Sequence, residues 1–193
     1  MSREARTTVV SSRGAAVAVA SGMIALALTV VAPTTAFATT AAQLGQTREN
    51  YFCSPSEQWI QTATSSGRSY VVPNGYTKLT KWRTRGGTDA GTMQFEVWAP
   101  AGGKKYTLVY ISAETALEAG KITTVALEPA VKVVAGDVIG YRSVSPANCA
   151  LETGNAADSY LYDASRSAPS VGATVGFQGP ATGFEFNIAA VAR

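Results

Sequence analysis

The chain has 193 residues, with 16 Lys and Arg, 13 Asp and Glu, and no histidine. The absence of histidine excludes Ser-His-Asp and Cys-His catalysis of the usual kind, and also zinc, copper and non-haem iron sites that need a histidine ligand. This length fits one ordinary domain that follows a leader.

The first 38 residues have the organisation of a signal peptide. Three arginines precede an apolar stretch at residues 15–31, and residues 36–38, Ala-Phe-Ala, match a signal-peptidase site. The alternative is an uncleaved membrane anchor, but a stretch of about 17 residues that is rich in alanine lies at the lower edge of what spans a bilayer. We therefore expect a secreted, extracellular protein that meets the membrane only during export.

Cleavage after Ala38 changes the charge balance. It removes Arg3, Arg6, Arg13 and Glu4, which leaves 13 basic and 12 acidic side chains and a net charge of +1. A nearly neutral protein has no long-range field for polyanions, so nucleic acid is not expected as a partner. Residues 39–50 are small, polar and aperiodic, which predicts a flexible lead-in to a domain at residues 51–193.

Cys53 and Cys149 are the two cysteines of the chain. In an oxidising compartment they most simply form a disulfide. Closing a loop of about 100 residues removes about 4–5 kcal/mol of freedom from the unfolded chain in the chain-entropy account. A reactive thiol is the alternative, but neither cysteine has a basic neighbour that would lower its pKa.

From Trp59 onward, apolar and polar residues alternate with a period of two, and Gly, Pro and Asn interrupt the pattern. Residues 113–119 are the one helical candidate and are equally compatible with a loop. Strand spacings of about ten residues predict an all-β fold, an antiparallel β-sandwich or jelly roll of about 8–10 strands. The expected strands lie at residues 70–72, 77–84, 93–98, 106–112, 123–127, 131–134, 138–144, 159–162, 174–177 and 184–191.

Three segments carry a resemblance: Val-Val-Pro-Asn-Gly at residues 71–75, Leu-Thr-Lys-Trp at 79–82 and Val-Val-Ala-Gly-Asp-Val-Ile-Gly at 133–140. Together they resemble a loose group of uncharacterised secreted bacterial proteins with a Pro-Gly entry turn, a tryptophan strand and a late Ala-Gly-Asp-x-x-Gly hairpin. The resemblance covers most of the mature chain and implies a jelly-roll-like β-sandwich. The group has no assigned activity, so the resemblance implies no functional residue. Taken alone, Asp137 after Gly136 is typical of a tight turn.

Trp82 and Trp98 are candidate binding residues. If Phe95 and Val97 face the core, Trp98 points outward from the same strand. Leu79 and Trp82 have opposite parity in a regular strand, so either a β-bulge lies between them or one of them leaves the core. An exposed tryptophan can stack on a sugar ring or on a partner protein. The alternative is that a loop or a second sheet covers each indole.

Lys81, Arg83 and Arg85 share one face of an expected strand. Three like charges at this spacing cannot be buried together without partners, which predicts a solvent-facing or edge strand. Positive side chains on an edge strand also discourage sheet-to-sheet aggregation. The functional alternative is a site for an anionic polymer, such as a cell-wall glycopolymer or an acidic polysaccharide.

Carboxylates are the remaining chemical groups. Glycoside hydrolysis needs only two acids, but most of the 12 acids of the mature chain fall in turns or on polar strand faces. The stretch that holds Glu152, Asn155, Asp158 and Asp163 could offer hard oxygen ligands to calcium, although it lacks a dense Asp-x-Asp-x-Asp spacing. We expect no metal and no cofactor.

These features predict a secreted, non-catalytic β-sandwich that binds a surface glycan or an extracellular protein partner. One alternative is a small carboxylate-dependent carbohydrate-active enzyme. Another is a secreted enzyme inhibitor that presents residues 86–91 or 154–158. The sequence predicts no oligomeric state.

Overall fold

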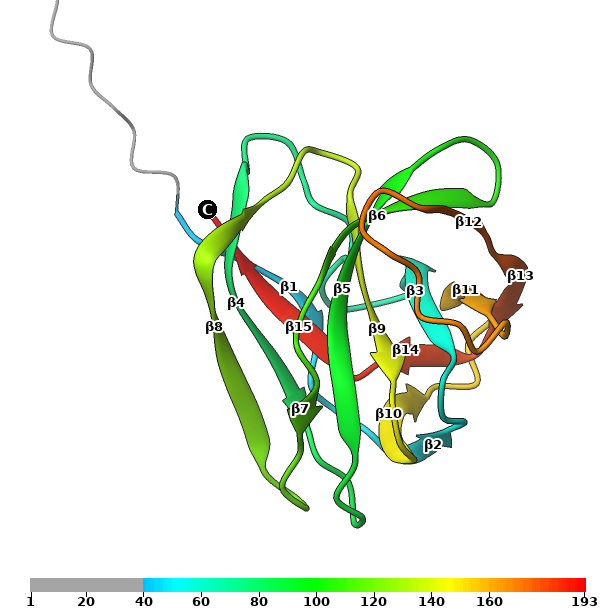
Figure 1. The fold of residues 1–193 in the computed structure, drawn as a ribbon. Helices are drawn as coiled ribbons and strands as arrows, with labels where there is room; N and C mark the ends of the chain where they lie inside the picture. Colours follow the sequence, from blue (N-terminus) through cyan, green and yellow to red (C-terminus); the bar gives the residue numbers. More distant parts are fainter. Residues whose placement is uncertain (1–39) are drawn as a thin grey trace, which may run out of the picture. The chain divides into compact units, whose positions relative to one another are not determined.

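The computed structural model describes residues 40–193, so the predicted signal peptide at residues 1–38 lies outside the described residues. Within residues 40–193 the elements are all strands (Figure 1), and no helix there could cross a membrane. The 15 strands are β1 (Ala42–Gln46), β2 (Tyr51–Cys53), β3 (Gln58–Ala63), β4 (Lys78–Arg85), β5 (Thr92–Pro100), β6 (Lys105–Ile111), β7 (Thr115–Ala116), β8 (Ile122–Lys132), β9 (Val138–Ser143), β10 (Ala147–Glu152), β11 (Ser159–Asp163), β12 (Thr174–Gly176), β13 (Gln178–Thr182), β14 (Phe184–Phe186) and β15 (Ile188–Ala192).

The strands form three antiparallel sheets. Sheet A has the order β1-β15-β4-β8, sheet B has the order β14-β10-β2, and sheet C has the order β12-β6-β5-β9-β3-β11-β13, with β7 paired to β5. The two edge strands of sheet C, β12 and β13, are separated in sequence only by Phe177. Sheet C therefore curls until it is nearly closed and barrel-like. The predicted all-β antiparallel fold is confirmed.

Sheets A and C share the main apolar core. Trp82 of β4 stacks on Phe95 of β5, with ring centroids 5.7 Å apart and planes 9° from parallel. A β-bulge between Leu79 and Lys81 allows Leu79 and Trp82 to be buried together, which is one of the two predicted alternatives. Removing about 200 Å² of indole surface from water contributes on the order of 5 kcal/mol.

The same core continues on the concave side of sheet C. Trp98 of β5 is fully buried and meets Phe177 edge to face, with centroids 5.0 Å apart. The Trp98 indole N–H donates a hydrogen bond of 3.0 Å to the carboxylate of Glu96. Trp98 therefore points away from Phe95, as its parity predicts, but into a covered interior rather than into solvent.

Two expectations for the N-terminal part of the domain are wrong. Residues 42–46, expected within a flexible lead-in, form β1, which pairs along its whole length with β15. Residues 70–72, expected as a strand, contribute only an isolated bridge from Val71 to Val138.

The C-terminal strand pattern is also divided differently. The sequence predicts separate strands at residues 123–127 and 131–134, but residues 123–127 and 131–132 lie in the single strand β8, and residues 133–134 lie beyond its end. Residues 184–191 split at Asn187 into β14 of sheet B and β15 of sheet A. Asn187 is fully buried, and its side chain bonds the backbone N–H and carbonyl of Arg85 and the carbonyl of Asn148. This asparagine therefore ties sheets A and B together at the point where the chain changes sheet.

Candidate binding site

Neither predicted tryptophan is available to a ligand. The side chains of Trp82 and Trp98 are both 0% exposed. The prediction that they form a binding surface is therefore wrong, and the stated alternative of a covering layer is correct for both. The physical reason is that both faces of β5 and the inner face of β4 are covered by other parts of the sheets.

The predicted basic residues Lys81, Arg83 and Arg85 lie on the face of β4 opposite Trp82, and each is partly exposed. They face solvent, as predicted. The suggested edge position is wrong, because β4 is paired with β15 on one side and with β8 on the other.

Cys53 and Cys149 form the predicted disulfide, with Cα atoms 5.7 Å apart. Cys149 lies at a shift of register in β10, between Asn148 and Ala150, which pair with Phe52 and Tyr51 of β2. The bulge leaves Cys149 without a direct partner in the ladder. The disulfide therefore holds the three-residue strand β2 to β10 at a point where the ladder is interrupted.

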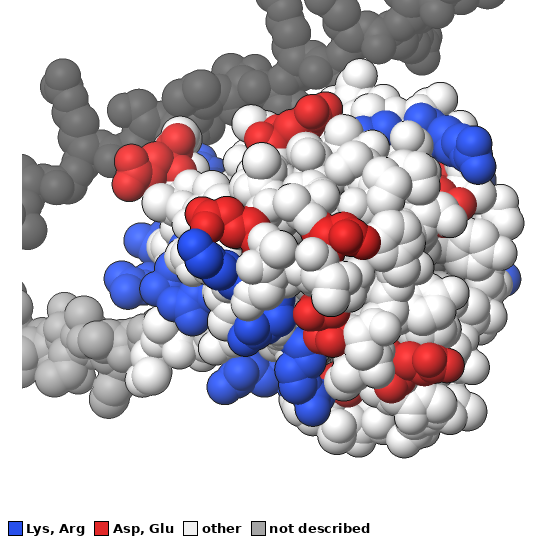
Figure 2. Space-filling model, turned by 90° about the horizontal axis from the view of Figure 1, so that it is seen from below, with Lys and Arg blue, Asp and Glu red and all other residues white. Residues whose placement is uncertain are grey.

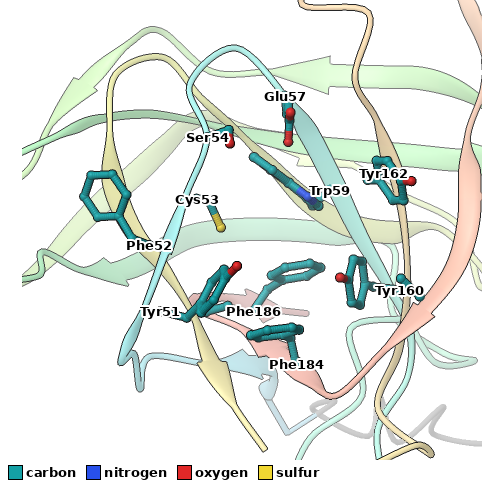
Figure 3. Close-up of a pocket in the computed structure, with 12 residues that line it drawn as sticks. Tyr51, Phe52, Cys53, Ser54, Glu57, Trp59, Tyr160, Tyr162, Phe184 and Phe186 are labelled. Atoms are coloured by element: carbon teal, nitrogen blue, oxygen red, sulfur yellow. The ribbon is translucent and has the colours of Figure 1, made fainter. Parts of the chain in front are cut away.

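Beside this disulfide, the structure contains a cavity of about 290 Å³ between sheet B and the neighbouring strands of sheet C (Figure 3). Most of its wall is aromatic, and the aromatic residues come from β2, β3, β11 and β14. The lining residues are Tyr51, Phe52, Cys53, Ser54, Glu57, Trp59, Ala150, Tyr160, Tyr162, Ala181, Phe184 and Phe186.

The aromatic rings of this pocket form one connected network. Ring centroids are 4.4 Å apart for Tyr51 and Phe184, 6.0 Å for Phe184 and Tyr160, 5.1 Å for Tyr160 and Phe186, and 6.4 Å for Trp59 and Phe186. Figure 3 shows Trp59, Tyr51, Phe184 and Tyr160 placed around Phe186. Because the rings support one another, the pocket presents fixed apolar faces to a ligand.

Two of the lining residues have exposed aromatic side chains, of which Tyr51 points toward the other rings and Phe52 points away from them (Figure 3). Tyr51 is 44% exposed and Phe52 is 47% exposed, and they are the large aromatic residues most open to solvent within residues 40–193. The other exposed large apolar residues, Ile122, Val134 and Val171, are aliphatic and do not line this pocket. Exposed aromatic surface is therefore concentrated at one place on the domain.

Glu57 is the one charged side chain among the lining residues. Partial burial raises its pKa, and the positive charge of Arg166 opposes that rise. Figure 3 shows the carboxylate beside Trp59, on the same side of the pocket as the Ser54 hydroxyl. This side of the pocket can accept hydrogen bonds from hydroxyl, amide or ammonium groups.

The sequence offers two uses for carboxylates, glycoside hydrolysis and calcium binding, and the structure shows where the candidate acids lie. Glycoside hydrolases place two carboxyl groups about 5–10 Å apart across the scissile bond. The residues that line the cavity include one carboxylate, that of Glu57. In the suggested calcium stretch, Asp158 accepts bonds from Ser65 and Thr153, and Asp163 accepts bonds from Ser165. Across residues 40–193, no three Asp, Glu, Cys or His side chains are grouped so that they could hold a metal ion.

The pocket residues were not among those predicted from the sequence. Two local signals were present: Tyr51-Phe52 directly before a disulfide cysteine, and Tyr160 and Tyr162 on the same side of one strand. Neither signal connects these segments with each other. Their proximity depends on the pairing of β11 with β3 and of β10 with both β2 and β14.

No family model matches this chain, and neither a curated protein nor a solved structure matches it significantly. The resemblance to secreted bacterial proteins stays a prediction.

Proposed function

We propose that this chain is a secreted, non-catalytic protein that binds a glycan in its aromatic pocket. The observation that carries the proposal is the cavity of about 290 Å³ that is lined by a connected group of aromatic rings, with a carboxylate at its side. Sugar rings have apolar faces that pack on aromatic rings and hydroxyl groups that donate to carboxylates. A volume near the lower end of the range for ligand sites suits one sugar residue, with the rest of the glycan outside.

The negative charge of the pocket indicates which class of glycan it can bind. Glu57 is the charged group of the lining, so an acidic sugar would bring two negative charges together in a partly buried place. A neutral sugar or an amino sugar avoids this repulsion. The pocket therefore favours neutral or amino glycans over uronic acids.

The disulfide supports both parts of the proposal. A bond between Cys53 and Cys149 suits an oxidising compartment outside the cytosol, in agreement with the predicted signal peptide. It also holds β2, an edge strand of three residues that carries Tyr51 and Phe52. Without this link, one wall of the pocket would depend only on the short ladder to β10.

The test is retention on a panel of insoluble polysaccharides and cell walls, including chitin, chitosan, cellulose and xylan. We expect wild-type protein to be retained on at least one neutral or amino glycan. Tyr51→Ala removes an exposed pocket wall and should weaken binding about tenfold, which corresponds to about 1.4 kcal/mol. Ile122→Ala is the matched control, because Ile122 is similarly exposed, at 47%, and lies outside the pocket.

Three outcomes would contradict the proposal. The first is no retention on any glycan of the panel. The second is equal weakening by Tyr51→Ala and Ile122→Ala. The third is release of reducing sugar that is lost in Glu57→Gln, which would favour the carbohydrate-active enzyme. Tight co-elution with one extracellular protein in place of glycan binding would favour a protein partner or the inhibitor alternative.

A further inference from the structure

The outer face of sheet A carries a line of basic side chains on an otherwise uncharged centre. Lys81 is flanked across the sheet by Val191 and Ala126, and Arg83 by Ala189 and Thr124. The ion pairs within residues 40–193 are Arg48–Glu185 and Lys121–Glu118, so Lys81, Arg83 and Arg85 pair with no carboxylate. None of the three therefore forms an ion pair within residues 40–193, and the acid of this sheet, Glu128, lies on the neighbouring strand β8.

Protection of a sheet edge does not explain this line. Positive side chains blunt exposed edges because an edge strand has free backbone N–H and carbonyl groups. β4 is an inner strand, and its ladders to β15 and β8 satisfy both sides of its backbone. Because β4 has no unpaired edge, its three positive charges are not needed to prevent edge-to-edge aggregation.

The charge of the domain is divided unequally between sheet A and the remainder. The strands of sheet A contain five basic residues and one acid, a net charge of +4. Residues 40–193 together have 13 basic and 12 acidic residues, so everything outside these strands has a net charge of −3. Seen from below, Figure 2 shows most of the blue side chains on the left, the side where Figure 1 places β4 and β8, with red side chains beside them. The net charge of +1 over residues 40–193 is therefore the sum of a positive sheet A and a negative remainder.

We propose that the outer face of sheet A binds a linear acidic glycopolymer along β4. Alternate residues on a strand are about 6.6–6.8 Å apart, so Lys81, Arg83 and Arg85 offer cations at regular intervals over about 13 Å. A single small anion at one exposed cation gains little, whereas a polymer engages several cations together. Carboxylates of uronic acids and phosphodiesters of polyol phosphates share the required chemistry.

The three basic side chains differ in how free they are to bind an anion. Within residues 40–193, the side chains of Lys81 and Arg83 donate no hydrogen bond, and the shielded Nε atom of Arg83 leaves its terminal nitrogens as the groups that can meet a ligand. Arg85 already donates to the carbonyls of Thr47, at 3.3 Å, and Gly120, at 3.0 Å. Lys81 and Arg83 are therefore the main anchors, and Arg85 adds charge from a fixed position.

The surroundings favour a glycopolymer over a single-stranded nucleic acid. Nucleic acid binding without sequence preference uses aromatic side chains on which bases stack. The cross-strand neighbours of Lys81 and Arg83 are Ala, Val and Thr, and the exposed aromatic residues Tyr51 and Phe52 belong to sheet B. This face offers charge without a stacking platform.

The test uses immobilised polygalacturonate, which supplies carboxylates, and immobilised linear polyphosphate, which supplies phosphodiester-like charge, with neutral dextran and single-stranded DNA beside them. We expect binding to at least one of the two polyanions at about 50 mM salt, with a steep loss as salt shortens the screening length. The double variant Lys81→Gln with Arg83→Gln should weaken this binding about tenfold. The matched control is Lys104→Gln with Lys105→Gln, which removes the same charge from exposed positions at the turn between β5 and β6.

Lys81→Gln alone repeats the test with less risk to the fold, and we expect a loss of about threefold with an unchanged circular dichroism spectrum. Tyr51→Ala should leave polyanion binding unchanged, so failure of this proposal is distinct from failure of the pocket. The proposal is overturned if neither polyanion binds, if both double variants lose binding equally, or if DNA binds as tightly as the better polyanion.

Discussion

Replacing Glu96 by Gln should make the protein more stable at alkaline pH and leave it nearly unchanged at acidic pH. Glu96 is fully buried on the concave side of sheet C, where one carboxylate oxygen accepts the Trp98 indole N–H and the other has no partner. Burial raises its pKa to about 8, against opposing effects of the Trp98 hydrogen bond and Arg142, and Asp163 adds to the rise. Glu96 is therefore protonated in the folded protein at neutral pH.

The size of the effect follows from proton linkage. In the unfolded chain, Glu96 titrates near its ordinary value of 4.5. Between pH 4.5 and about 8 the folded state holds a proton that the unfolded state lacks, so the free energy of unfolding falls as pH rises. The slope approaches about 1.4 kcal/mol per pH unit, which amounts to on the order of 4–5 kcal/mol across the window. Gln keeps the shape and the acceptor for Trp98 but does not titrate.

The assay is urea unfolding at pH 5 and at pH 8.5, followed by tryptophan fluorescence. The difference between wild type and Glu96→Gln isolates this one group, because other titrating carboxylates contribute equally to both. We expect a difference of less than about 1 kcal/mol at pH 5 and of several kcal/mol in favour of Glu96→Gln at pH 8.5. The exposed Glu152 on β10 provides the control Glu152→Gln. Parallel stability curves for wild type and Glu96→Gln would refute the reasoning.

Three further substitutions test how the fold is held together. Replacing Cys53 and Cys149 by Ala opens a link between positions 96 residues apart and should lower the free energy of unfolding by about 4–5 kcal/mol; a loss below about 1 kcal/mol in urea denaturation would show that loop closure does not restrict the unfolded chain. A Cβ at Gly140 would lie 2.4 Å from the carbonyl oxygen of Trp59, whereas one at Gly176 meets open space. Gly140→Ala should therefore lower the melting temperature by the equivalent of about 1–3 kcal/mol and Gly176→Ala should not, with equal shifts as the contrary result. Asn187→Ala leaves backbone groups of Arg85 unpaired and should cost about 2–3 kcal/mol in the same urea experiment, where an unchanged midpoint would count against the bridge between sheets.

Strand alternation made the central part of the fold predictable. The pattern around Met93, Phe95 and Val97 lies in β5, and the parity conflict between Leu79 and Trp82 marks a real bulge. Parity alone does not say what covers the second face of a strand. Trp98 is buried because residues 174–182 close sheet C around it, and this closure depends on pairings far apart in sequence. Burial of both faces is a property of the assembled sheets.

The pocket could not be predicted for a related reason. Its strand β2 has three residues, which is too short for a period of two to be recognised. The residues that face Tyr51 come from β14, which is more than 100 positions away in sequence. The sequence also predicts one final strand, whereas Phe184 and Phe186 lie in sheet B and Ile188 lies in sheet A. The change of sheet depends on the side-chain hydrogen bonds of Asn187, which no periodicity reveals.

Nuclear magnetic resonance of the indole N–H groups tests the central claim most directly. The chain has three tryptophans, and Trp59 lines the pocket while Trp82 and Trp98 are fully buried elsewhere. Titration with soluble oligosaccharides of the glycan that retains the protein should shift the Trp59 indole signal and leave the other two in place, and Tyr51→Ala should weaken that shift. Glycan binding with an unmoved Trp59 signal, or with equal shifts of all three signals, would contradict binding in the aromatic pocket.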